Sequence, residues 1–172
     1  CKIVIGGANA PDKDQLYFKD KPYVDYLIHQ EGEISFLGLL KSLVGEGDET
    51  SIPGISINRN GERIVTGKSV RIDDLTNVPS PYLTGVFDKI VEECKDRDDI
   101  ILNGIIETNR GCPFMCTFCD WGGTTFGKVK KFDITRIKAE LQWFADNKIE
   151  YVNNTDANFG IYKERDMAIV DL

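Results

Sequence analysis

The stretch CPFMCTFC, residues 112–119, places three cysteines at the spacing C-x3-C-x2-C, and the rest of the chain is organised around it. Cysteines this close together in one loop can direct their sulfurs at a common centre the size of a small metal cluster. Thiolates are soft ligands, so the candidate metals are iron–sulfur, zinc and copper(I). Iron–sulfur cubes normally use four cysteines, and closed zinc sites use four ligands. Cys112, Cys116 and Cys119 therefore predict a metal centre with one position open or filled from elsewhere.

The composition is typical of a globular protein from a reducing compartment such as the cytoplasm. The chain has 172 residues, 41% apolar and 28% charged, which suffices to bury a core. Its net charge of −7 argues against nucleic-acid binding, which depends on neutralising phosphates. No apolar run approaches the roughly 20 residues that span a bilayer, so we expect no membrane partner. Five cysteines, three of them clustered, favour a metal site over a disulfide framework.

The first fifty residues have the pattern of an α/β domain. Residues 2–5 form a short apolar run that ends at Gly6 and Gly7, and residues 24–28 form a second apolar run. Both runs predict buried parallel strands. A helix is predicted from about residue 34 to residue 44, with its apolar face formed by Phe36, Leu39, Leu40 and Leu43. We interpret residues 1–50 as the last third of a doubly wound domain. Because the chain opens at Cys1 just before a strand, we expect a segment of a longer protein.

Residues 51–98 are predicted to form a linker. Asn60-Gly61 lies between two short apolar runs, which is the preferred two-residue turn of a β-hairpin. Residues 72–85 contain Pro79 and Pro81, which disfavour helix and predict an extended connector. The apolar residues from Val86 onward then recur at helical spacing, and Cys94 is predicted to pack there as a small hydrophobe.

Residues 99–172 have the pattern of a repeating strand–loop–helix unit. An apolar strand over residues 100–106 leads to the cysteine loop, and Asp133 is a good N-cap for a helix that ends near residue 145. Residues 151–152 predict the next strand, and Asp166 is expected to open a further helix. Repeated, this unit builds a parallel barrel whose active site lies at the carboxyl ends of the strands. The cysteine loop and residues 156–160 should both lie at that end.

The motif, with the aromatic Phe118 just before its last cysteine, resembles the signature of the radical S-adenosylmethionine (SAM) enzymes. Three further stretches resemble one branch of that superfamily, whose members carry an N-terminal cobalamin-binding domain. These stretches are VPSPYLTG at 78–85, ETNRG at 107–111 and DANFG at 156–160. The resemblance covers nearly the whole chain from Lys2 onward. It implies the end of a cobalamin-binding-type α/β domain, a hairpin linker and the start of a partial (β/α) barrel.

The resemblance also implies a chemistry. Cys112, Cys116 and Cys119 would hold a [4Fe–4S] cluster whose open iron is chelated by SAM. Reductive cleavage of SAM would then give a 5′-deoxyadenosyl radical, with an electron from an external donor of the flavodoxin or ferredoxin type. The branch further implies cobalamin and methyl transfer. The substrate, a small molecule or a peptide, is not identified by these residues, and neither are catalytic side chains.

Several contacts are implied residue by residue. Phe118 would lie near the adenine of SAM, Asp156 and Asn158 would contact SAM, and Gly6 and Gly7 would approach the corrin ring. From the residues alone, the glycines are equally explained by a strand-to-loop turn. Asp156 and Asn158 are equally explained by local turns of the backbone.

Two other readings of the cysteine loop remain open. A structural zinc module would recruit a fourth ligand, His29 or Cys94, although such sites usually offer two paired ligand clusters. A simple ferredoxin would need a fourth cysteine nearby, and none follows Cys119. Lys128, Lys130 and Lys131 form a basic cluster, usually a solvated face, where an anion or a reductase could dock. Because the barrel is unfinished and exposes a strand edge, we expect the isolated segment to be inactive.

Overall fold

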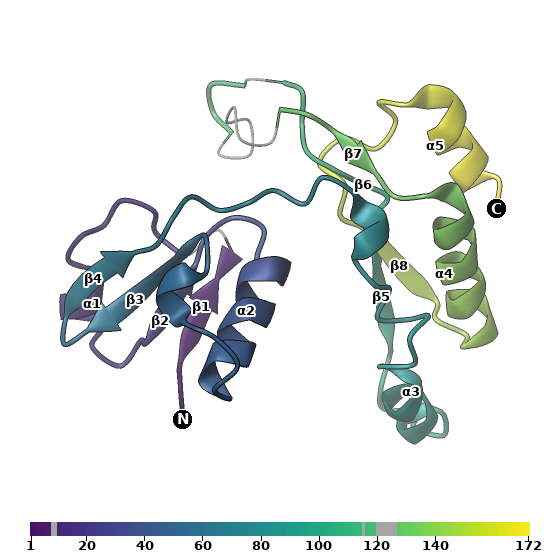
Figure 1. Cartoon of the computed structure of the whole chain (residues 1–172). Coiled ribbons are helices and arrows are strands. Elements are labelled where there is room, and N and C mark those ends of the chain that lie inside the picture. The colour runs from purple at the N-terminus through teal and green to yellow at the C-terminus, as the bar shows by residue number, and fades with distance from the viewer. Residues whose placement is uncertain (8–9, 115, 120–126) are drawn as a thin grey trace. The chain divides into compact units, whose positions relative to one another are not determined.

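The computed structural model describes residues 1–7, 10–114, 116–119 and 127–172 and divides into two compact units (Figure 1). The first unit is Cys1–Ile72 and the second is Asp73–Leu172. No helix within these described ranges is long and apolar enough to cross a membrane.

The first unit contains a four-stranded sheet in the order β1-β2-β3-β4. β1 (Val4–Gly6) and β2 (Tyr26–Ile28) are parallel, with Ile5 opposite Leu27. β3 (Ile55–Arg59) runs antiparallel to β2, and β4 (Glu62–Val65) runs antiparallel to β3. The strands expected over residues 2–5 and 24–28 are confirmed as β1 and β2. The α/β class of the fold is confirmed as well.

Both faces of this sheet are buried in apolar clusters, because successive side chains of a strand point to opposite faces. One cluster includes Leu39 of α2 (Glu33–Leu43), and the other includes Tyr17 and Phe18 of α1 (Tyr17–Asp20). The short helix η2 (Glu49–Ser51) precedes Ile52, which joins the first cluster. The first cluster comprises Tyr26, Ile28, Leu39, Ile52, Ile55 and Ile57; the second comprises Ala10, Tyr17, Phe18, Val24 and Leu27.

The hairpin is confirmed, but it is not a separate linker element. Asn60 and Gly61 both have positive φ, 56° and 87°, as a type I′ turn requires. The first hairpin strand pairs with β2 and thereby extends the sheet of the first unit. The reason is burial: Ile55 and Ile57 are fully inaccessible to solvent, which a free-standing hairpin could not achieve.

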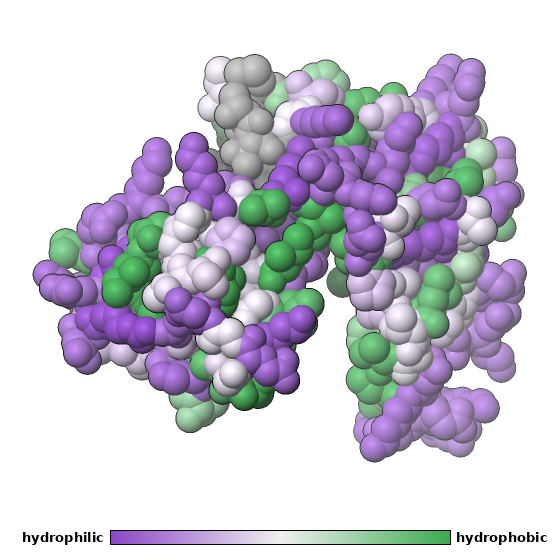
Figure 2. Space-filling view, viewed as in Figure 1, coloured by the Kyte–Doolittle hydropathy of each residue, from purple (hydrophilic) through white to green (hydrophobic). Residues whose placement is uncertain are grey.

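The predicted apolar face of α2 is wrong in most positions. Leu39 is fully buried, but the other three residues of that face are 41–45% exposed. The reason is Gly38, because a Cβ added there would lie 3.3 Å from Ile52 Cγ2. The helix therefore approaches the sheet through its small residues, and Ser35 is the second buried position. Figure 2 shows hydrophobic residues exposed among hydrophilic ones on the face in view.

The second unit is built on a parallel pair of strands. β5 (Asn103–Ile106) pairs with β8 (Tyr151–Asn154), with Ile106 opposite Asn154. The chain between them forms α4 (Ile134–Asp146), so the predicted strand–helix–strand unit is confirmed. The carboxyl ends of both strands consequently lie at one edge of the pair.

Close packing joins α4 to β5. Asp133 caps the helix as predicted, because its carboxylate accepts a hydrogen bond from Thr135 N at 2.7 Å. Ile137 and Phe144 of α4 are buried. A Cβ added to Gly104 would lie 2.7 Å from the Phe144 ring, so only glycine allows this approach.

Some boundaries differ from the expected ones. β5 begins at Asn103, three residues later than predicted, and the last helix, α5 (Lys163–Val170), begins before Asp166. Cys94 is half-buried at the end of α3 (Asp88–Cys94). The connector contains one turn, η3 (Leu75–Asn77), and otherwise forms no helix before Pro81.

Tyr82, in this connector, covers one side of β5. Its hydroxyl donates to Ile105 O at 2.6 Å and accepts a hydrogen bond from Ile105 N at 3.1 Å. Its ring lies 4.6–5.3 Å, centroid to centroid, from the rings of Phe87, Trp143 and Phe144. A side chain thus satisfies backbone groups that a neighbouring strand would otherwise pair.

Candidate metal centre at the carboxyl ends of two parallel strands

The cysteine loop is closed at its base by two short strands. β6 (Asn109–Arg110) pairs antiparallel with β7 (Lys130–Lys131), and Phe132 N donates to Thr108 O at 3.0 Å. All three cysteines of the motif lie between these strands. The chain therefore leaves and returns at the same place, directly after β5.

The three cysteines are free thiols in different surroundings. Cys112 is buried, Cys119 is half-buried and Cys116 is exposed. A turn joins the last two, since Cys119 N donates to Cys116 O at 3.2 Å. Gly111 enters the loop at a φ of 116°, which favours glycine. Phe118, expected near the adenine, is 90% exposed.

The residues described do not gather any three His, Cys, Asp or Glu side chains closely enough to hold a metal ion. Residues 115 and 120–126 lie outside the described part of the loop. The donor set nevertheless fits a soft metal centre, because it consists of three free thiols within one loop between β6 and β7.

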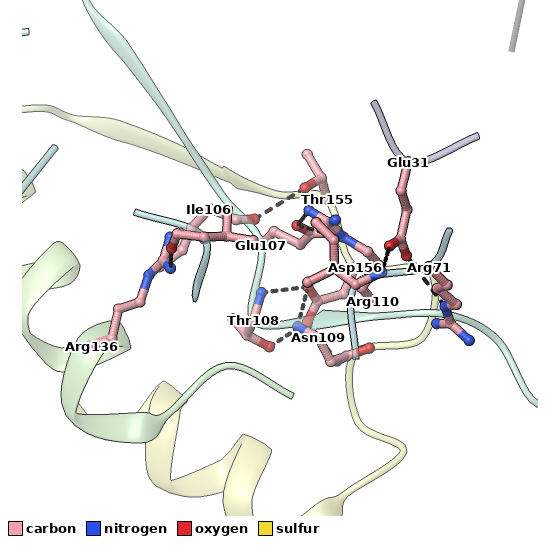
Figure 3. Close-up of polar contacts among 12 residues, drawn as sticks. Glu31, Arg71, Ile106, Glu107, Thr108, Asn109, Arg110, Arg136, Thr155 and Asp156 are labelled. Carbon is pink, nitrogen blue, oxygen red and sulfur yellow. Dashed lines mark hydrogen bonds and ion pairs between the residues drawn. The ribbon is translucent and has the colours of Figure 1, made fainter. Parts of the chain in front are cut away.

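Asp156 joins the ends of the two strands (Figure 3). Its carboxylate accepts hydrogen bonds from Thr108 N at 2.6 Å, Asn109 N at 3.0 Å and Asn109 Nδ2 at 2.7 Å. The Thr108 hydroxyl also donates to it. Thr155 N, next to Asp156, donates to Ile106 O at 2.9 Å, which continues the pairing of β5 and β8. Asp156 therefore adjoins the entry of the cysteine loop. This agrees with the prediction that residues 156–160 and the cysteine loop lie at the same ends of the strands.

Arg165 of α5 also binds the base of the cysteine loop. Its Nη2 donates to Thr108 O at 2.7 Å and to Phe132 O at 3.3 Å, one carbonyl from each end of the loop. Its Nη1 contacts Asp166 Oδ1 at 2.9 Å. Asp166, which is 2% exposed, accepts hydrogen bonds from Gly160 N and Tyr162 N and so fixes the loop after β8.

Other charged residues at the loop are also engaged. Arg110 forms hydrogen bonds with the Glu107 carboxylate, the shortest of them 2.8 Å. The expected basic cluster is solvated only in part, because Lys130 is buried and contacts Asp73 Oδ1 at 2.8 Å. Lys131 lies over the Tyr162 ring, with Nζ 4.3 Å from its centroid. Lys128 and Lys131 are exposed, so two of the three lysines face solvent.

Asn158 lies in the loop after β8, partly buried, and its Nδ2 finds no partner among the residues described. Gly6 and Gly7 lie in the first unit, where Gly6 is the last residue of β1. Gly7 has a φ of 78°, and a Cβ added there would meet nothing within 4 Å. Ala10 N donates to Gly7 O at 3.0 Å, which fits the strand-to-loop turn, one of the two explanations of these glycines. Their approach to the corrin stays a prediction.

The loop after Gly7 is held by Arg63 of β4. The Arg63 guanidinium donates to the carbonyl oxygens of Pro11, Asp12 and Asp14 at 2.9, 3.0 and 2.7 Å. Its Nε also donates to Ser56 Oγ at 3.0 Å. This contact was not predictable from the sequence, because an arginine in a hairpin strand is usually solvated.

His29 is buried at the end of β2. Its Nε2 lies 2.7 Å from Ser56 Oγ, and the Asp12 carboxylate lies 2.8 Å from Nδ1, outside good hydrogen-bond geometry. Burial lowers the pKa of His29, which Asp12 opposes and Arg63 reinforces. These contacts within the first unit give His29 a structural role there, which disfavours it as a zinc ligand.

Comparison with known proteins relates nearly the whole chain to larger proteins. It is 42% identical over 168 residues to the cobalamin-dependent radical SAM methyltransferase TokK of Streptomyces tokunonensis, covering 97% of this chain and 24% of TokK. It is 41% identical, over the same shares, to a 2-(S-pantetheinyl)-carbapenam-3-carboxylate methyltransferase of Streptantibioticus cattleyicolor. The chain thus spans about a quarter of the length of these relatives. No protein-family model matches.

Solved structures show the same fold. TsrM from Kitasatospora setae, a radical SAM methyltransferase solved with tryptophan and a SAM analogue, has a TM-score of 0.67 at 16% identity. The match covers 99% of this chain and 32% of TsrM. Sequence similarity thereby confirms the resemblance inferred from the motifs, and structural similarity confirms the α/β fold.

Proposed function

We propose that this chain, a relative of part of the cobalamin-dependent radical SAM methyltransferases, forms the cluster-binding part of a radical SAM enzyme. The observation that carries the proposal is the closed loop with three free thiols at the carboxyl ends of β5 and β8. It stands in a chain that is 42% identical to TokK over 97% of its length.

The residues of the loop fit a [4Fe–4S] cluster with one open iron. Three thiolates from Cys112, Cys116 and Cys119 would bind three irons and leave the fourth for SAM, since an open position distinguishes catalytic from structural metal sites. When bound, such a cluster supplies one electron to the sulfonium of SAM, which is cleaved to methionine and a 5′-deoxyadenosyl radical. An external reductant must provide that electron.

The chain's own residues would hold and shield this centre. Gly111 turns the chain so that Cys112 enters the interior, where burial excludes water from its sulfur. Phe118, exposed beside Cys119, is free to stack on an adenine ring. Asn158, with a buried donor that lacks a partner among the described residues, would contact SAM from the loop after β8.

We further infer that the chain works with cobalamin in methyl transfer. TokK is named as cobalamin-dependent, and TsrM has been solved with cobalamin and a [4Fe–4S] cluster. Gly6 and Gly7 would approach the corrin, because they end a parallel strand and leave open space at Gly7. The carboxyl ends of parallel strands are where open α/β sheets bind ligands.

Anaerobic reconstitution with iron and sulfide tests the proposal. The reduced protein should give the electron paramagnetic resonance (EPR) signal of a [4Fe–4S] cluster, and SAM should change that signal. Alanine at Cys112, Cys116 and Cys119 should abolish it, whereas Cys94→Ala should leave it intact. A signal indifferent to SAM would contradict SAM binding at the cluster. Stoichiometric zinc without any cluster would support the structural zinc module instead.

A further inference from the structure

We infer that Asp156 is a positioning residue for the cysteine loop and does not itself bind SAM. This inference rests on the proposed function. A carboxylate offers about four lone-pair sites, and the four donors of Thr108 and Asn109 occupy that number at Asp156. No acceptor site is left for the ammonium or hydroxyl groups of SAM.

The two residues that Asp156 binds lie at the entry of the loop and pair with residues at its exit. Asn109 begins β6 and pairs with Lys131 of β7, while Thr108 O accepts the hydrogen bond from Phe132 N. Thr108 and Asn109 are each 1% exposed, so solvent cannot replace the hydrogen bonds that their backbone groups make with Asp156. Fixing these two residues therefore fixes where the chain enters and leaves the loop.

The contact is directional, which makes it suited to positioning. Hydrogen bonds to charged acceptors are shorter and stronger than neutral ones, and their geometry is narrow. The Asn109 amide must turn its Nδ2 toward the carboxylate, because only the NH₂ group donates. Arg165 complements this arrangement, because it binds Thr108 O and Phe132 O.

Asp156→Asn is the decisive variant, because it keeps the shape of the side chain but replaces one acceptor with a donor. The new NH₂ group would face donors of Thr108 or Asn109. Mutation of residues that do not bind the metal but orient its ligands typically lowers metal affinity about 10–100-fold. We expect D156N to lower iron and sulfide retention by about that factor and to broaden the EPR signal of the remaining cluster.

Ile137→Val serves as the matched control for stability. Ile137 is fully buried in α4 of the same unit, and the variant should destabilise the fold modestly without touching the loop base. It should retain wild-type cluster content.

An exchange of the two side chains provides a rescue experiment. Asn109→Asp alone should repel Asp156, because two carboxylates would then face each other. N109D combined with D156N restores a donor–acceptor pair and should recover part of the cluster.

The outcomes separate this inference from the proposed function. If D156N holds a full cluster with an unchanged EPR signal, Asp156 does not position the loop. If D156N holds a full cluster but loses only its response to SAM, Asp156 contacts SAM directly and the inference is overturned. If the wild-type chain binds no cluster, the proposed function fails, and the inference fails with it. Equal losses in D156N and I137V would assign the effect to stability and also overturn the inference.

Discussion

The two units hold their strands in place by different kinds of contact. In the first unit, apolar clusters cover both faces of the sheet. In the second, the carboxyl ends of β5 and β8 are joined by Asp156, Arg165 and Asp166. Apolar packing is non-directional and tolerates changes of shape that conserve volume. Hydrogen bonds to charged groups fix angles as well as distances. The region next to the cysteine loop is therefore held by directional contacts.

The largest effect is expected for Leu27→Ala in the first unit. Leu27 is fully buried in the middle of β2, and loss of its side chain leaves a cavity. The free energy of unfolding of this unit should fall by about 2–5 kcal/mol in urea denaturation. Leu27→Met, which conserves volume, should cost less than about 1.5 kcal/mol. Equal losses in both variants would contradict the view that non-directional packing holds this sheet.

A smaller effect is expected for Gly104→Ala in the second unit. The added Cβ would lie 2.7 Å from the Phe144 ring, which is buried and has little room to move. Overpacking should lower the free energy of unfolding by about 1–3 kcal/mol. In a double-mutant cycle, Phe144→Leu should relieve part of this loss. Strict additivity of the two changes would mean that β5 and α4 are not in close contact.

Tyr82→Phe should cost about 1 kcal/mol, the usual net value of a hydrogen bond between neutral groups. The variant removes the hydroxyl that binds both Ile105 N and Ile105 O. Hydrogen exchange of the Ile105 amide should accelerate, which is the direct measurement. Tyr151→Phe, at an exposed position of β8, is the control and should leave exchange at Ile105 unchanged.

The smallest effect is the pH dependence contributed by His29. Burial lowers its pKa in the folded state, so the unfolded state binds the proton more readily. Stability should therefore be fully present above the unfolded pKa of about 6.5 and decline as pH falls below it. Denaturation of His29→Gln between pH 7 and pH 5 should show a shallower slope. An unchanged slope would place the pH dependence on other groups.

Local signals in the sequence predicted local structure well. Asn60-Gly61 predicted the hairpin turn, and Asp133 predicted the helix cap. Each of these outcomes depends on backbone groups only a few residues away. The cysteine spacing similarly identified the candidate metal site, because its chemistry lies within eight consecutive residues.

Long-range contacts were not predictable in the same way. Asp156 was expected at the active-site edge, but its partners lie 47 and 48 residues away and no pattern specifies them. Nothing in the sequence predicts the contacts of Arg165 with Thr108 and Phe132, since an arginine in a helix is usually solvated. The apolar spacing of α2 predicted the wrong buried face. Spacing alone cannot reveal that Gly38 allows the helix to approach Ile52 closely.

The pairing of β6 with β7 has a consequence for chain entropy. Residues 111–129 form a long excursion between these strands. Closing such a loop costs free energy that grows only slowly, by about 0.6 kcal/mol per doubling of length. The hydrogen bonds between β6 and β7 offset part of that cost. A cluster held by the three cysteines would then have to order only the gaps of three and two residues between them.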